Sequence, residues 1–254
     1  MTLGARPLRI LVTVAGLTGL WHLGHLAAGG RSYLLPSPWQ TVIALIERWD
    51  TIAGHAGVTI VEILLGLSLG CLLGVGTALL LALFRPVRQW LMPVLVVSQA
   101  IPVFAIAPLL VLWLGYGLGS KVAMAMLIIY FPVTTAFFDG LRRTETGWLD
   151  LARVMGGGRW AVLWRIRLPA ALPAFASGLR VATAVAPIGA VVGEWVGSSA
   201  GLGYLMLHAN ARMQVPLMFA ALLVLAAFSI TLYALVDAGL RRALPWVPDD
   251  QRES

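Results

Sequence analysis

The chain has 254 residues, of which 59% are hydrophobic and 11% are charged, and its mean hydropathy is +0.88. Soluble domains carry about 25% charged residues, so the composition excludes an ordinary soluble domain and predicts a polytopic membrane protein. The net charge of +7 could indicate nucleic-acid binding. The cationic residues instead gather beside apolar segments, as membrane topology requires, and no nucleic-acid partner is expected.

Continuous apolar runs predict an all-α membrane fold of about six transmembrane helices, because the spans of a β-barrel would alternate in hydropathy. The run before residue 28 could be a signal peptide, but it lacks a clean cleavage site and continues through Trp21, which favours a transmembrane helix. The first expected span ends at about residue 28. The other five lie at about 59–84, 90–114, 121–141, 171–196 and 215–240. We expect three regions: 1–57 with an external amphipathic helix, a permease core at 58–241, and a tail at 242–254.

Between the first two spans, Ser37 is a predicted N-cap and Pro38 the first helical residue. Apolar residues then recur at helical spacing through Trp49, opposite polar ones. This pattern predicts a short amphipathic helix at the membrane surface, where it would serve as an anchor.

Glycine and proline mark the second and third spans. Three glycines spaced by four form one smooth face for close helix packing, and three prolines interrupt the third span; these are Gly66, Gly70, Gly74, Pro93, Pro102 and Pro108. Glu62 lies near the outer end of the second span, where shallow depth would keep it hydrated. The single Cys71 predicts neither a disulfide nor a metal site.

The arginines predict the orientation. One side holds thirteen of them and the other side four cations, which places both termini and the loop 142–170 in the cytoplasm. The first set is Arg6, Arg9, Arg85, Arg88, Arg142, Arg143, Arg153, Arg159, Arg165, Arg167, Arg241, Arg242 and Arg252; the second is Arg31, Arg48, Lys121 and Arg212. Asp139 is expected to pair with its neighbouring arginines at the cytoplasmic end.

The cytoplasmic loop carries a spaced motif. Its first part reads D-x-A-x-x-x-G from Asp150 through Gly156, and I-x-L-P follows at 166–169. Residues 145–155 predict a short helix that ends at three glycines, and 159–167 predict a second one. The spacing resembles the E-A-A-x3-G-x9-I-x-L-P signature of ABC-importer permeases, with Asp150 and Leu151 as mild departures. The branch it resembles handles sulfonates, taurine, nitrate and thiamine-precursor pyrimidines.

This resemblance implies a type I importer fold in a bacterial inner membrane. It further implies a homodimer that works with two cytoplasmic ATPase subunits and an external binding protein. The segment 145–157 would be the coupling helix, and the coupling residues would be Asp150, Ala152, Arg153, Gly156 and Arg159. Gly156–Gly158 lack the G-K-[ST] ending of a phosphate loop, so ATP would be bound and hydrolysed by the partner, and no cofactor, metal or catalytic residue is expected here.

Candidate pathway residues are the polar, aromatic or helix-breaking ones within the apolar spans and outer connections: Gln99, Pro102, Tyr130, Arg180, Glu194, His208 and Asn210. Glu194 could mark the pathway or lie hydrated at the headgroups. The tract 186–214 resembles thiamine-precursor pyrimidine permeases more than sulfonate permeases. The favoured function is therefore import of such a pyrimidine by alternating access, and the alternative is aliphatic sulfonate, taurine or nitrate.

Two other classes of function deserve comparison. G-S-S-A-G at 197–201 matches the nucleophile elbow of a serine hydrolase, with Ser199 at its centre and His208 and Glu194 nearby. That elbow requires a strand before the serine, whereas a transmembrane helix is expected there. A membrane scaffold without transport is disfavoured, because a mere anchor would not need the glycines and prolines of the spans.

Overall fold

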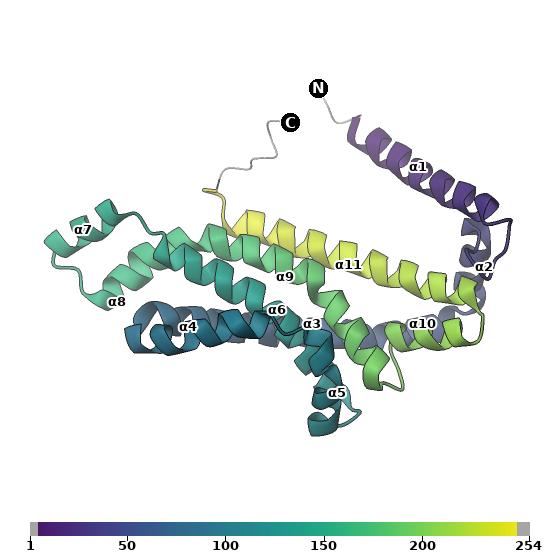
Figure 1. Cartoon of the computed structure of the whole chain (residues 1–254). Coiled ribbons are helices and arrows are strands. Elements are labelled where there is room, and N and C mark those ends of the chain that lie inside the picture. The colour runs from purple at the N-terminus through teal and green to yellow at the C-terminus, as the bar shows by residue number, and fades with distance from the viewer. Residues whose placement is uncertain (1–4, 248–254) are drawn as a thin grey trace. The chain divides into compact units, whose positions relative to one another are not determined.

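The computed structural model describes residues 5–247, and all of its regular structure over these residues is helical (Figure 1). Arg252 and residues 248–254 of the predicted tail lie outside this range. The elements are α1 Ala5–Ala27, α2 Pro38–Glu47, α3 Trp49–Leu83, α4 Arg85–Gln99, α5 Val103–Leu114, α6 Leu118–Arg142, α7 Thr146–Val154, α8 Arg159–Val162, the π-helix η1 Leu163–Arg167, α9 Leu168–Gly197, α10 Leu202–Ala211 and α11 Val215–Ala243.

Every predicted span is found as helix. Over the described residues, four helices are long and apolar enough to cross a membrane: α3, α6, the continuous helix Arg159–Gly197, and α11. The third predicted span is a bent pair, since α4 and α5 meet at 103° around Pro102 (Figure 1). The first predicted span lies in α1, where the apolar stretch Leu11–Ala27 is shorter than the four spanning helices. The predicted interruption is therefore confirmed at Pro102, whereas Pro93 and Pro108 lie inside α4 and α5 and do not break them.

The chain divides into two compact units. Of the described residues, unit 1 comprises 5–58 and 200–226, and unit 2 comprises 59–199 and 227–247. In unit 1, Ser37 caps α2: its hydroxyl accepts a bond from the Gln40 N–H, and the Gln40 side chain accepts one from the Ser37 N–H. This reciprocal arrangement is a capping box, and it confirms the N-cap and first-turn proline expected from the sequence.

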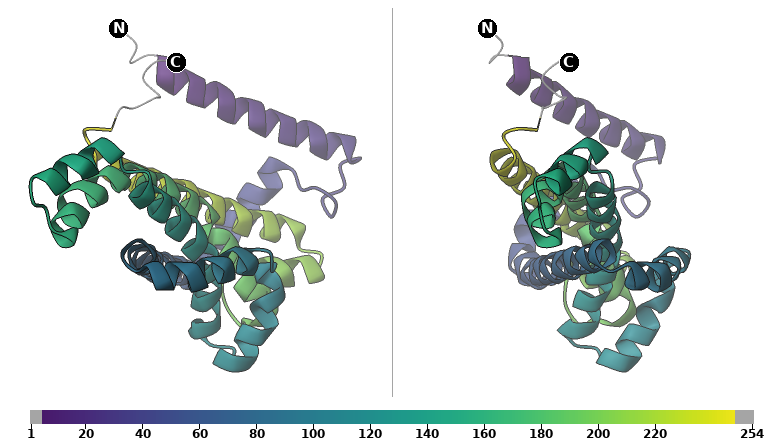
Figure 2. Two further views of the ribbon diagram at one scale, coloured as in Figure 1. Left: turned by 60° about the vertical axis from the view of Figure 1, so that its left-hand side comes forward. Right: turned by 90° about the vertical axis from the view of Figure 1, so that its left-hand side faces the viewer.

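Unit 2 is organised by close contact of α3, α6 and α9, the last two of which run alongside each other in both views of Figure 2. A Cβ atom placed on Gly66 of α3 would lie 2.5 Å from the Cβ of Ala125 of α6, and one on Gly189 of α9 would lie 2.6 Å from the Ala125 Cα. Cβ atoms on Gly70 and Gly74 would lie 2.8 Å and 2.9 Å from side-chain atoms of Ile129 and Val133 of α6. The predicted glycine face is confirmed, because no larger residue fits at this separation.

The second short helix of the cytoplasmic loop differs from its prediction. We expected a separate short helix at 159–167 and a fifth span beginning near Ala171, but the helix is continuous from Arg159 to Gly197. Pro169 has no N–H and its ring would crowd the carbonyl four residues earlier in a regular α-helix. The π turn η1 precedes it, and there the Leu168 N–H donates to the Leu163 carbonyl. A wider turn lets the helix pass through Pro169 unbroken.

Candidate functional site

The glycine turn after α7 has a defined geometry. The Gly157 N–H donates to the Ala152 carbonyl at 2.8 Å, and the Gly156 N–H donates to the Arg153 carbonyl at 3.0 Å. Gly156 has φ +75°. This pair of bonds with a left-handed residue is a Schellman motif. The D-x-A-x-x-x-G spacing thus has a structural reason: Ala152 supplies the buried carbonyl that is capped, and Gly156 adopts a backbone conformation that disfavours a side chain.

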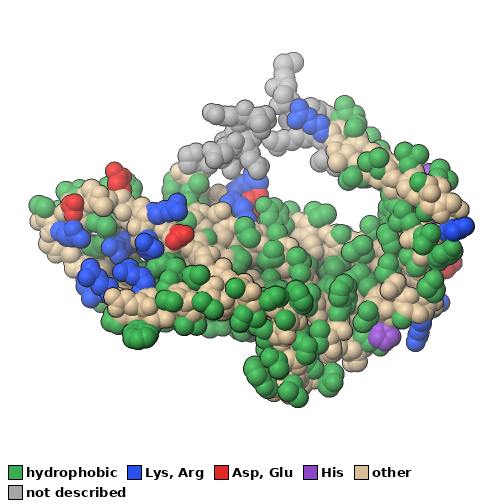
Figure 3. Space-filling model, viewed as in Figure 1, with side chains coloured by type: hydrophobic (Ala, Val, Ile, Leu, Met, Phe, Trp, Pro, Cys, Tyr) green, Lys and Arg blue, Asp and Glu red, His purple; other side chains and the backbone are tan. Residues whose placement is uncertain are grey.

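The outer surface of α7 is both charged and apolar. Arg153 donates to Asp150 at 2.6 Å, and their side chains are 71% and 66% exposed. Next to this pair, Leu151 is 60% exposed and Val154 is 87% exposed. On the face shown in Figure 3, Lys and Arg side chains gather at the end of unit 2 that holds α7 and α8, and hydrophobic side chains predominate along the helices next to it. An exposed ion pair contributes about 0–1 kcal/mol, so this surface is not held together by its own charges.

The helix after the glycine turn is fixed to the core of unit 2. Arg159 donates to the Leu83 carbonyl, in the last turn of α3, at 2.7 Å. Leu163 is 3% exposed and packs with Leu81, Phe138 and Ala171 in one apolar cluster. The predicted coupling residues are therefore brought together at one end of the unit, but Arg159 is engaged within the chain, unlike Asp150 and Arg153.

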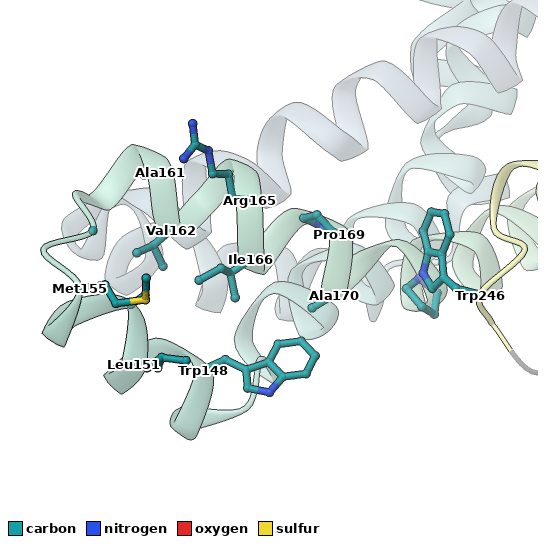
Figure 4. Close-up of a pocket in the computed structure, with 13 residues that line it drawn as sticks. Trp148, Leu151, Met155, Ala161, Val162, Arg165, Ile166, Pro169, Ala170 and Trp246 are labelled. Carbon is teal, nitrogen blue, oxygen red and sulfur yellow. The ribbon is translucent and has the colours of Figure 1, made fainter.

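A hollow of about 830 Å³ separates α7 from the helix that follows it. Trp148, Leu151 and Met155 of α7 face Val162 and Ile166 of α8 and η1, while the Arg165 guanidinium points away from them (Figure 4). Trp246 and the first turns of α9 complete the lining. This hollow is apolar on both of its walls.

Three pathway candidates lie on α4, α5 and α6 of unit 2. Gln99 ends α4 and Pro102 is the N-cap of α5, and both are exposed at the 103° bend. Tyr130 is half-buried on α6, and its hydroxyl donates to Thr77 at 3.2 Å. The structure thus brings Gln99 and Pro102 together at a helix break, and it places Tyr130 between α6 and α3.

Arg180 has a partner that the sequence analysis did not identify. It donates to Asp237 of α11 at 2.7 Å, and their side chains are 32% and 13% exposed. Asp237 also accepts bonds from Arg241, four residues later. The i,i+4 spacing of Asp237 and Arg241 was the available signal, but the sequence separation of 57 between Arg180 and Asp237 hid the second contact.

Glu194 is fully buried at 1% exposure, which decides against hydration at the headgroups. Its Oε1 accepts a hydrogen bond from Thr59 at 2.6 Å, and Glu62 lies close enough to act on it electrostatically. Glu62 is also 1% exposed, so the expectation that shallow depth keeps it hydrated was wrong. Lys121 is 3% exposed and lies close enough to act on both carboxyl groups. From the sequence, Lys121 was expected only to mark the outer side of the membrane.

The last two candidates belong to α10 in unit 1. His208 and Asn210 are exposed, and the His208 ring lies 4.0 Å from that of Tyr204. Ser199 stands in the turn after α9, so a helix precedes it and not the strand that a nucleophile elbow requires. Among the described residues there is no group of three or more His, Cys, Asp or Glu side chains that could hold a metal ion.

Comparison with known proteins gives consistent matches. Residues 66–247 match the family described as the binding-protein-dependent transport system inner membrane component. A probable ABC transporter permease protein of Haemophilus influenzae is 56% identical over 237 residues, covering 93% of this chain and 97% of that protein. The formylaminopyrimidine transport permease ThiX of Halalkalibacterium halodurans is 38% identical, covering 85% and 87%.

Two further matches concern substrate and fold. The riboflavin transport system permease RibX of Chloroflexus aurantiacus is 36% identical, covering 92% of this chain and 88% of that protein. A solved structure of the MetNI methionine ABC transporter superposes with a TM-score of 0.66, covering 77% of this chain and 97% of the matched chain. The sequence identity to that structure is 16%, so this match concerns the fold alone.

Proposed function

Since this chain belongs to the family of binding-protein-dependent transport system inner membrane components, we propose that it imports a thiamine-precursor pyrimidine by alternating access, driven by ATPase subunits that dock on α7. As a member of the family it is a multi-pass protein of the inner membrane and a transport permease, not an enzyme. Its partners are an ATPase and an external binding protein. Two copies of the chain would form the pore.

The docking proposal depends on the surface of α7. Val154 exposes an apolar side chain beside the charges of Asp150 and Arg153, and such a mixture is typical of an interface core with a polar rim. Water on the cytoplasmic side would otherwise hydrate this apolar group at a cost of about 25 cal/mol per Å². A partner protein that covers Val154 and pairs with Arg153 would remove this cost.

The connection from α7 to the spans supports a coupling role. The Schellman turn joins α7 to α8, and Arg159 and Leu163 fix α8 and η1 to the ends of α3 and α6. The continuous helix then carries any displacement of α8 into α9. Movement imposed on α7 by ATPase closure would therefore reach the membrane core through a packed path, without an intervening flexible linker.

The substrate proposal rests on two similarities. The whole chain is similar to ThiX, a formylaminopyrimidine permease by name, and the tract 186–214 resembles thiamine-precursor pyrimidine permeases. Aliphatic sulfonate, taurine or nitrate is the alternative, and riboflavin, taken by name from RibX, is a third candidate. We propose that the pathway passes the α4–α5 bend at Gln99 and Pro102, because broken helices at membrane depth commonly line substrate sites. Tyr130, Arg180, Glu194, His208 and Asn210 remain further candidates for it.

The substitution Val154→Asp tests docking separately from folding. The Val154 side chain is 87% exposed in the isolated chain, so its replacement should leave the thermal stability of the purified permease unchanged. Placing a carboxylate at the centre of the interface should abolish both co-purification of the ATPase and uptake. Gln89→Glu is the control, since it adds the same charge at an exposed site on α4. Normal uptake by the Val154→Asp variant would refute docking on α7.

Uptake measurements identify the substrate. The permease, its ATPase and its binding protein would be reconstituted in liposomes, and ATP-dependent uptake of labelled formylaminopyrimidine would be measured. We expect unlabelled pyrimidine to compete and taurine, nitrate and riboflavin to fail. Competition by one of the latter compounds alone would move the assignment to that substrate while leaving the docking result intact.

A further inference from the structure

Arginines from four helices gather at one end of the apolar cluster that packs α3, α4, α6 and η1 together. Arg159 of α8 donates to the Leu83 carbonyl at the end of α3 at 2.7 Å. The Arg142 guanidinium lies 5.5 Å from the centre of the Phe138 ring, which is buried in the cluster. One arginine each from α4 and η1 completes the group. The arginine rim, as we call it, comprises Arg88, Arg142, Arg159 and Arg167.

Arg167 holds a donor that the described part of the chain does not satisfy. It lies four residues after Leu163 and four before Ala171, and both of these residues are buried in the cluster. That spacing places all three on nearly the same side of the helix, so the base of the Arg167 side chain is enclosed. Its Nε atom is buried, and over residues 5–247 it has no hydrogen-bond partner. A buried N–H without an acceptor is unfavourable, so an acceptor from outside this part of the chain is expected.

Arg88 and two tryptophans place the rim at the depth of the lipid headgroups. Val87 and Leu91 of α4 pack against the cluster, and Arg88 between them is half-buried at the edge of that face. Trp90, two residues after Arg88, is 82% exposed, and Trp164 of η1 is 59% exposed. Exposed tryptophans near the ends of membrane-spanning helices are typical of the headgroup region. The anions that the rim meets at this depth are lipid phosphates.

Over residues 5–247, no carboxylate is paired with the arginine rim. None of the ion pairs found there includes a member of the rim. Asp139 was expected from the sequence to pair with its neighbouring arginines, but it forms no ion pair within these residues. Asp150 is paired with Arg153 of its own helix. Four like charges at one place repel one another, so an external anion would stabilise the rim.

The rim lies on a different side of α8 and η1 from the surface of α7 that we propose for ATPase docking. Val162 and Ile166 face α7 across the hollow (Figure 4). Leu163, flanked by Arg159 and Arg167, is instead buried against α3 and α6. An ATPase bound to α7 would therefore leave the rim to the lipid.

We propose that the arginine rim binds the phosphate of an anionic phospholipid. Guanidinium groups donate in a planar fork that matches phosphate oxygens, and basic pockets between transmembrane helices bind anionic headgroups. A zwitterionic phospholipid carries its own cation, so it would leave the charge of the rim uncompensated. The bound phosphate would link α4 and α6 to η1, and it would thereby hold the helix that follows the glycine turn against the spans.

Native mass spectrometry of the delipidated, full-length permease measures this site. Phosphatidylglycerol and phosphatidylcholine are added in competition, and inorganic phosphate is added separately. We expect the wild type to prefer phosphatidylglycerol, and we expect Arg88→Gln with Arg167→Gln to reduce this preference by about tenfold or more. Equal binding of the two lipids by the wild type would overturn the proposal.

Arg143→Gln with Arg165→Gln is the matched control, since it removes the same charge from two exposed positions at this end of unit 2 and should keep the preference. An equal loss in both double variants would indicate general attraction of anions and no built site. Displacement of phosphatidylglycerol by inorganic phosphate would assign the rim to a free anion, and its displacement by the ATPase would assign the rim to the protein interface. Each of these results would contradict a lipid site.

A second test, Arg167→Met, separates lipid binding from packing. The replacement keeps a long side chain but removes the unsatisfied Nε. In phosphatidylglycerol nanodiscs that hold the permease and its ATPase, the Tm of the variant should lie roughly 2–4 °C below that of the wild type, because the headgroup loses a donor. In phosphatidylcholine its Tm should equal or exceed that of the wild type, because no anionic lipid satisfies the buried donor there. Equal losses of Tm in the two lipids would mean that Arg167 contributes packing alone, and would refute the proposal.

Discussion

The turn after α7 and the packed interface of α3, α6 and α9 both depend on glycine, but for different purposes. At the turn, Gly156 adopts φ +75°, and a Cβ atom on it would meet nothing within 4 Å. At the interface, Gly66 is helical, and a Cβ atom on it would lie 2.5 Å from Ala125. The first position is restricted by backbone conformation and the second by the neighbouring helix.

The two regions also differ in how far their charged side chains are exposed. Asp150 and Arg153 are mostly exposed and form an ion pair with each other, whereas Glu62, Lys121 and Glu194 are almost completely buried. The interface of α3, α6 and α9 satisfies its packing within one chain, but the surface of α7 leaves apolar and charged groups for a partner. Mutations should therefore affect folding at the interface and assembly at the turn.

The largest effect on stability is expected at the helix interface. Gly66→Ala should cost about 1–3 kcal/mol of unfolding free energy, because the added methyl group forces α3 away from α6. Gly76→Ala on the same helix is the control, since a Cβ there meets nothing within 4 Å and alanine is the better helix former. Thermal unfolding of the two variants in detergent micelles measures the difference. Equal Tm values would refute the close contact of α3 with α6.

A smaller effect on stability, with a large effect on assembly, is expected at the turn. Gly156→Ala places a side chain in the left-handed region at a cost of about 1–2 kcal/mol, which local rearrangement of the turn can relieve. We expect little change in the Tm but reduced ATPase co-purification, because the end of α7 moves. Gly158→Ala, at φ −67° with open space around it, should behave as the wild type. Reduced co-purification by both variants would indicate that φ is not the cause.

The smallest effect is expected at a second helix end with the same geometry. After α10, the Gln214 N–H donates to the Ala209 carbonyl, and Met213 has φ +58°. Met213 therefore holds the position that Gly156 holds after α7, at the cost of a strained backbone. Met213→Gly should raise the unfolding free energy by up to about 1 kcal/mol, since the strain relieved exceeds the added chain entropy. A lowered Tm would show that the exposed Met213 side chain contributes more than its backbone costs.

Local features were predictable from the sequence. The Ser37 cap, the helix end at Gly156 and the break at Pro102 all follow from what one residue permits its own backbone to do. The face of Gly66, Gly70 and Gly74 was predictable because its period matches the helix. Each of these features depends on residues within about two helical turns of one another.

Long-range features were not predictable in the same way. Glu194 meets Thr59 across 135 residues, and Arg180 meets Asp237 across 57. The sequence identified Glu62, Glu194 and Arg180 as unusual residues, but hydropathy alone cannot distinguish a hydrated end from a dry interface. The continuity of α8 with α9 was also hidden, because Pro169 ordinarily indicates a helix start.

The π-helix η1 has a mechanical consequence for this continuity. A π turn contains one more residue than an α turn, and each residue in an α-helix corresponds to about 100° of rotation and 1.5 Å of rise. If η1 were converted to α-helix, the preceding residues from Arg159 would turn about the common axis by roughly that angle relative to α9. Arg159 could then no longer reach the Leu83 carbonyl. Pro169 opposes that conversion, because its ring would then crowd the carbonyl four residues earlier, so the π turn fixes the rotational position of Arg159 relative to α9.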